Sequence, residues 1–175
     1  MLLADLCLQY YILFNEQKYL DEINNIFAWI KNTELINDKN LINDGINLNT
    51  CKNNYEQIFS YNQCIIPYVM IKIGILQNNS ELIVKGKNII DASLKFFVNE
   101  NNIFNEGDMI NEDRKTFKGI YFKYLMYIYD LLDINDVLKK KIKEIVNNTY
   151  NSVKQIFFDN NSKIGSNWII FTDDV

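Results

Sequence analysis

The side chains best suited to acid–base chemistry are four carboxylates in two long polar links, at Asp44, Glu106, Asp108 and Asp113. The chain contains no histidine, which removes the commonest general base and the commonest metal ligand. Acid–base chemistry would therefore rest on carboxylates, tyrosine, lysine or cysteine. Two of the four carboxylates also have a structural interpretation, because Asp44 can form an Asp-Gly turn and Asp113 can cap a helix.

A second group of polar residues is typical of sites that recognise neutral hydroxylated ligands. Tyr61 offers an apolar ring face with a polar tip, and the amides of Asn62 and Gln63 combine donors with acceptors. Lys118 stands at the start of a predicted helix, where a cation gains nothing from the helix dipole. A role in a ligand cleft, or a nearby carboxylate as partner, would explain why a lysine stands at the start of this helix. The competing interpretation is structural, with Tyr61 in the core and Lys118 in solvent.

Composition narrows the class of protein and of partner. The chain has 175 residues, of which 48% are hydrophobic and 14% aromatic, enough for one compact domain with a core. The net charge of −4 argues against nucleic acid as the main partner, because phosphate binding needs clustered Lys and Arg. Cys7, Cys51 and Cys64 match no zinc or redox spacing. We expect no cofactor, no metal and no membrane interaction, since no apolar run reaches transmembrane length.

Apolar residues recur at spacings of three and four along almost the whole chain, which predicts an all-α fold. The pattern gives six helical segments in three antiparallel hairpins, a repeat with a period of roughly 55–60 residues. The segments cover residues 2–14, 19–30, 58–73, 82–97, 117–132 and 138–157. Ser80 is the expected N-cap of the fourth segment.

The links between the hairpins are longer than the turns within them and cover residues 32–54 and 99–112. The short turns would lie on one rim of the row of hairpins and the long links on the other. Function concentrates on loops that a rigid scaffold holds, so the rim with the long links is the predicted ligand site. We expect Asp44, Tyr61, Asn62 and Lys118 to converge there.

Two segments resemble signatures of glycoside hydrolase family 76, the endo-α-1,6-mannanases. Residues 60–64, Ser-Tyr-Asn-Gln-Cys, are similar to the family's Thr/Ser-Tyr-Asn-Gln-Gly, and residues 113–125 are similar to its Asp, spacer and Phe-Lys-Gly-Ile motif. Three shorter segments, residues 43–46, 105–106 and 164–168, also resemble the family's sequence and occur in the family's order. Cys64 replaces a glycine of the family pattern. Lys123 replaces an arginine, and the two are not equivalent at bidentate sites.

The resemblance implies half of an (α/α)6 toroid, the six-hairpin glycosidase fold, in a partial glycoside hydrolase domain over residues 1–175. It makes the chain the C-terminal half and places the N-terminal half before Met1. Family members resemble retaining enzymes that cut α-1,6-mannan with two consecutive aspartates in that N-terminal half. The only such pair here, Asp173-Asp174, lies outside the family context. We therefore expect no catalytic residue in this chain and no hydrolysis by the chain alone.

The resemblance also implies that the chain supplies one wall of a cleft for mannan or a related wall glycan. The expected substrate-binding residues are Asp44, Tyr61, Asn62, Gln63, Asp113 and Lys118. Half of a ring would leave apolar faces without neighbours at both ends, so we expect self-association. The residues of these faces are Leu2, Leu6 and Tyr10 at one end and Ile145, Val153 and Phe157 at the other.

Two alternatives stay open: a non-catalytic glycan-binding or wall-remodelling protein of the same fold, and a helical-repeat scaffold that binds protein. A rim rich in aromatic and amide side chains favours the sugar interpretations, and a continuous apolar or charged groove favours the scaffold. If the chain is half of a ring, it is a fragment of a longer protein, it pairs with another half, or it is a short solenoid. The intact parent would be extracellular or wall-associated, although residues 1–7 do not form a signal peptide.

Overall fold

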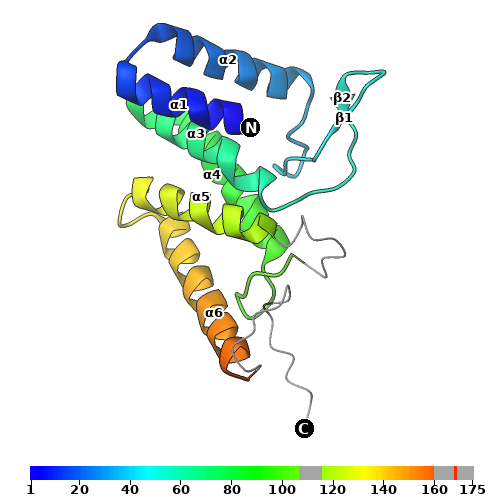
Figure 1. Cartoon of the computed structure of the whole chain (residues 1–175), viewed down its shortest axis with the longest axis vertical. Coiled ribbons are helices and arrows are strands. Elements are labelled where there is room, and N and C mark those ends of the chain that lie inside the picture. The colour runs from blue at the N-terminus through cyan, green and yellow to red at the C-terminus, as the bar shows by residue number, and fades with distance from the viewer. Residues whose placement is uncertain (107–115, 160–167, 169–175) are drawn as a thin grey trace.

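The computed structural model describes residues 1–106, 116–159 and 168. These residues form six helices and one two-stranded antiparallel sheet (Figure 1). The elements in chain order are α1 (Leu2–Phe14), α2 (Gln17–Asn32), β1 (Ile46–Asn47), β2 (Lys52–Asn53), α3 (Asn62–Leu76), α4 (Ser80–Phe97), α5 (Phe117–Leu131) and α6 (Val137–Asp159). The all-α class and the number of helices expected from the apolar spacing are confirmed.

The helices pair as α1–α2, α3–α4 and α5–α6, which are the three predicted hairpins. Helix α3 also packs against α1 on one side and α5 on the other, so the first helices of the three hairpins form one continuous layer. Figure 1 shows the hairpins following one another from the blue α1–α2 pair to the yellow and orange α5–α6 pair. Each hairpin buries an apolar face against the next, as packed helical layers must.

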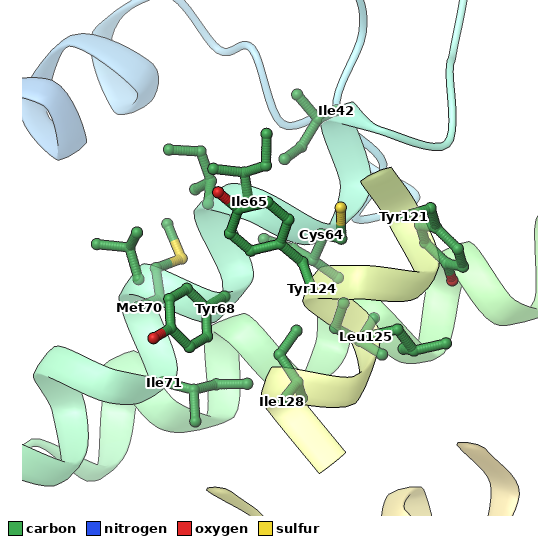
Figure 2. Packing of buried hydrophobic residues seen from close by; sticks show 14 of the residues in the cluster. Ile42, Cys64, Ile65, Tyr68, Met70, Ile71, Tyr121, Tyr124, Leu125 and Ile128 are labelled. Carbon is green, nitrogen blue, oxygen red and sulfur yellow. The ribbon is translucent and has the colours of Figure 1, made fainter. Parts of the chain in front are cut away.

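Helix α3 lies at the centre of the core. It is apolar on all sides, and most of its residues are buried. Its neighbour α4 approaches closely at Gly86, where an added Cβ would lie 2.8 Å from Ile71 Cγ1 and 3.0 Å from the carbonyl oxygen of Pro67. On the side of α5, Tyr68 of α3 packs against Tyr124 (Figure 2). The middle hairpin therefore organises the packing of both of its neighbours.

Two helix starts differ from the prediction. The N-cap of α4 is Asn79, whose Oδ1 accepts a hydrogen bond from the Leu82 amide at 3.1 Å, and Ser80 is the first helical residue. Asn and Ser are nearly equivalent as N-caps, so the sequence could not choose between neighbours. Helix α3 begins at Asn62 rather than near Ile58. Just before it, Ser60 is held by hydrogen bonds to Glu106.

The first long link is a closed loop rather than an extended strap. Its short sheet pairs Ile46 with Asn53. Two buried asparagines hold the loop, because Asn53 Nδ2 donates to Asn43 Oδ1 at 3.1 Å and Asn43 Nδ2 donates to the Glu56 carbonyl at 3.0 Å. Buried polar groups need such partners. The strands are too short for a periodic pattern, so the sequence did not predict them.

One turn occurs twice, at residues 36–42 after α2 and at residues 98–104 after α4. In each turn an asparagine side chain accepts two backbone N–H bonds, at Asn37 in the first turn and Asn99 in the second. Each turn also contains an asparagine in the left-handed region, Asn40 with φ 58° and Asn102 with φ 56°. An isolated antiparallel bridge closes each turn. The hairpin repeat therefore extends into the links.

Candidate functional site

Three of the predicted site residues meet where the first long link joins α3. Tyr61 Oη donates to Asp44 Oδ1 at 2.9 Å, and Asn62 Nδ2 donates to the same oxygen at 2.8 Å. Asp44 is exposed, Tyr61 is half-buried and Asn62 is buried. The two donors orient the carboxylate while leaving it in contact with solvent, so it can accept further hydrogen bonds from a ligand. We call these three residues the Asp44 cluster.

The Tyr61 phenol binds the Asp44 carboxylate while the phenol itself is un-ionised. Burial first, and the hydrogen bond to Asp44 second, raise the pKa of Tyr61 to about 12. The phenol therefore keeps its proton at neutral pH and donates a hydrogen bond to Asp44. This arrangement makes Tyr61 an orienting donor and not a general base.

Gln63 positions the Asp44 cluster from the interior. Its side chain is completely buried: Oε1 accepts from the Ile42 amide at 2.8 Å, and Nε2 donates to the Ile42 carbonyl at 2.7 Å. Nε2 also donates to the Phe59 carbonyl at 3.0 Å. The expectation that Gln63 contacts a ligand directly is corrected, because its amide binds backbone groups. Since Ile42 lies two residues before Asp44, this clamp sets the position of the carboxylate relative to α3.

Three aromatic rings lie beside the Asp44 cluster. The ring centroids of Tyr61 and Phe117 are 4.4 Å apart, those of Phe59 and Phe117 are 5.3 Å apart, and those of Phe59 and Tyr61 are 6.2 Å apart. All three side chains are half-buried. The residue types and their spacing did not single out Phe59 or Phe117 as site residues. Their positions in or beside the two motif-like segments were the available signal.

A second carboxylate, Glu106, reaches the same end of α3 from the second long link. Its two oxygens accept hydrogen bonds from the Ser60 amide and from Ser60 Oγ, each at 2.7 Å. Ser60 is completely buried. A negative charge near the N-terminus of a helix is favourable because it faces the positive end of the helix dipole. Glu106 therefore ties the second link to the start of α3.

Lys118 lies in the interior beside this second carboxylate. Its residue is 3% exposed, and Nζ lies 4.4 Å from the ring centroid of Trp168, a cation–π contact. Burial lowers the pKa of Lys118, and the negative charge of Glu106 acts in the opposite direction. The interpretation as a solvated surface lysine is wrong. Of the four residues expected to converge, Asp44, Tyr61 and Asn62 do so. Lys118 lies instead in the interior, near Glu106 and Trp168.

The remaining candidate residues divide between buried, exposed and undescribed positions. Asp108, Asp113 and Asp173-Asp174 lie outside the described residues. Cys64, where the family pattern has a glycine, is completely buried, and burial raises the pKa of its thiol. Cys7 is also buried and Cys51 is exposed.

In residues 1–106, 116–159 and 168, no group of Cys, Asp or Glu side chains is arranged to hold a metal ion. Among the helices that the structure describes, none has the length and apolar character needed to cross a membrane.

The three helical hairpins, with a carboxylate presented beside half-buried rings at the end of the central helix, define an all-α helical-hairpin protein. The model of glycosyl hydrolase family 76 matches residues 1–174. The chain therefore belongs to glycosyl hydrolase family 76, and the suspected resemblance is confirmed. No curated protein matches the chain.

Proposed function

We propose that the chain forms part of the glycan-binding cleft of a protein of the α-1,6-mannanase type. Family membership supports a glycan as the ligand. The observation that carries the proposal is the Asp44 cluster, in which an exposed carboxylate is oriented by two donors. Orienting an acceptor before the ligand arrives lowers the entropy cost of binding.

The chemistry of the Asp44 cluster suits a neutral sugar. Hydroxyl groups of a hexose can donate to the Asp44 carboxylate, which is a charge-assisted and therefore strong acceptor. The half-buried rings of Tyr61 and Phe117 offer apolar surface for the C–H face of the same sugar. This combination of an apolar surface with a few placed polar groups is typical of small-ligand sites.

In the intact form, we propose hydrolysis of mannan-type glycans by a retaining mechanism with two carboxyl groups about 5–5.5 Å apart. In this proposal the nucleophile and the acid/base belong to the consecutive aspartates of the family, and the Asp44 cluster positions the sugar. The intact protein would act outside the cell or in the wall, where such a glycan is found.

The binding proposal can be tested by titrating the ¹⁵N-labelled chain with α-1,6-mannotetraose, with cellotetraose as the control sugar. We expect the amide signals of Asp44, Tyr61 and Asn62 to shift with the mannotetraose and to stay in place with the control. Equal shifts with both sugars would contradict mannan specificity. An absence of binding would contradict the glycan-binding role.

The catalytic proposal has its own test, which is release of reducing ends from linear α-1,6-mannan. We expect none from this chain alone. Turnover that disappears in Asp44→Asn would show that Asp44 is catalytic and would overturn the assignment. The alternative, a non-catalytic glycan-binding protein, uses the same cluster. It would be favoured if a longer form that contains the consecutive aspartates bound mannan without cleaving it.

We also propose that the chain self-associates through α1. This helix is apolar on all sides, and Leu2, Leu6 and Tyr10 are 66%, 53% and 41% exposed. At the other end, Ile145 is 1% exposed and belongs to the core, whereas Val153 and Phe157 are half-buried. Sedimentation of the wild type against Leu6→Glu tests the proposal. A monomeric wild type at high concentration would contradict it.

A further inference from the structure

A polar hollow of about 530 Å³ lies between the turn at residues 36–42 and α4. It shares no lining residue with the Asp44 cluster. The side chains that matter for its chemistry are Lys39 and Asn40 from the turn and Asn88, Asp91, Lys95 and Phe96 from α4.

The shape of this hollow follows from the hairpin repeat. A second hollow of about 370 Å³ lies between the equivalent turn at residues 98–104 and α6. The two are lined at equivalent positions: Lys39 and Asn101, Leu41 and Ile103, Asn88 and Asn148, Asp91 and Asn151, Ala92 and Ser152, Lys95 and Gln155. The hollow itself is therefore a product of the architecture, and only its side chains can give it a ligand.

The side chains of the two hollows differ in a way that favours the first as a binding site. The lining of the second is neutral, mostly amides, and includes no aromatic ring. The lining of the first includes Phe96, which is 54% exposed. Helix α4 packs mainly against α3 of the same hairpin, and the neighbouring helices α1 and α5 contact α3. The first hollow thus has an exposed aromatic ring beside it, which the second hollow lacks.

The polar groups of the first hollow are held in place. Asp91 Oδ2 lies 2.6 Å from Lys95 Nζ, and Asp91 Oδ1 accepts from Lys141 Nζ at 2.8 Å. Burial alone would raise the pKa of Asp91, but the two lysines outweigh it and lower the pKa. The backbone of Asn40 is held by the turn, where its amide donates to the Asn37 carbonyl. Amide and charged groups arranged around one exposed ring match the alternating hydroxyl and C–H surfaces of a sugar.

We propose that this hollow is an accessory binding site for a neutral glycan chain, separate from the Asp44 cluster. The ligand class rests on the proposed function, because the glycan is taken to be the same α-1,6-linked mannan. The polymer would engage the Asp44 cluster and the hollow together. Two linked sites bind a long chain more tightly than a short oligosaccharide that reaches only one of them.

The proposal is tested by affinity electrophoresis of the chain in gels containing linear α-1,6-mannan. We expect Phe96→Ala to weaken retention about fivefold, the usual size of one aromatic contact. Gln155→Ala, at an equivalent position of the second hollow, is the matched control and should behave as wild type. Unfolding curves of both variants check that the fold is intact. Equal retention of Phe96→Ala and Gln155→Ala would overturn the proposal.

A second measurement on the unaltered chain separates this inference from the proposed function. Titration with α-1,6-mannotetraose should shift the amide signals of Asn88, Asp91 and Phe96 at higher sugar concentration than those of Asp44 and Asn62. Shifts at the Asp44 cluster alone would overturn the accessory site and leave the proposed function standing. Shifts at the hollow alone would support the accessory site and contradict the proposed cleft. No shift at either would overturn both.

Discussion

Asp44 and Glu106 are two carboxylates that reach the start of the same helix from two different links. Asp44 is exposed and accepts side-chain hydrogen bonds from Tyr61 and Asn62. Glu106 binds the amide and hydroxyl of the buried Ser60 and lies near the buried Lys118. The same local design therefore has two outcomes: an acceptor presented to solvent and a charge built into the interior.

The difference shows that residue type does not separate a ligand-binding carboxylate from a structural one. What separates them is the environment of the donors. Glu106 satisfies backbone and side-chain groups that would otherwise be buried without partners, which is costly to undo. Asp44 accepts from the half-buried Tyr61 and the buried Asn62, but the carboxylate itself is exposed to water. Substitution at Glu106 should therefore reduce stability, and substitution at Asp44 should reduce binding.

The largest effect is expected from Glu106→Gln, which keeps the shape and removes the charge. It weakens the bonds to Ser60 and removes the negative charge that favours the protonated Lys118, so the free energy of unfolding should fall by about 2–3 kcal/mol. Urea denaturation followed by circular dichroism measures this. The control is Glu100→Gln, an exposed glutamate of the same link. A loss below about 0.5 kcal/mol at Glu106 would show that the two carboxylates are equivalent.

Gln63→Ala is expected to have the next largest effect, a loss of about 2 kcal/mol. It leaves the amide and carbonyl of Ile42 buried without their partner. If Gln63 instead contacted sugar, mannotetraose affinity would fall while the denaturation midpoint stayed constant. Measuring the sugar affinity and the denaturation midpoint of this one variant shows whether Gln63 has a structural role or a binding role.

Asp44→Asn should leave the free energy of unfolding within about 0.5 kcal/mol of wild type, as exposed substitutions usually do. The affinity for α-1,6-mannotetraose should fall about tenfold, because a charge-assisted acceptor becomes a neutral one. Isothermal titration calorimetry gives the affinity. Asp38→Asn, an aspartate of the same link, is the control. Unchanged affinity in Asp44→Asn would move the sugar site away from this carboxylate.

The smallest effect concerns the pH dependence at Tyr61. Its folded-state pKa is raised to about 12 from the ordinary 10.0, so the un-ionised phenol is the favoured form in the folded chain. Its contribution to stability is complete below pH 10 and is lost as the pH rises through 12. The stability difference between wild type and Tyr61→Phe should therefore narrow over this range. A constant difference would show that burial and the hydrogen bond to Asp44 do not raise the pKa of Tyr61 in the folded chain.

Much of the fold follows from local patterns in the sequence. The spacing of apolar residues determines six amphipathic or fully apolar helices, and the lengths of the links determine how they pair. Helix starts are less certain, because Asn79 and Ser80 are both good N-caps. Recognition of the family also lay in the sequence, in the short segments around Tyr61 and Lys118, and the family model confirms it.

The sequence by itself determined the helices, their pairing and the residue types of the candidate site, because these depend on contacts between near neighbours in the chain. Only the tertiary structure decided which polar side chains face solvent. Gln63 and Asn62 are adjacent in the chain, yet Gln63 binds the backbone of Ile42 and Asn62 binds the side chain of Asp44. Both partners lie about twenty residues away, at positions set by how the link closes onto α3. No local pattern encodes that closure, since it depends on the packing of all three hairpins.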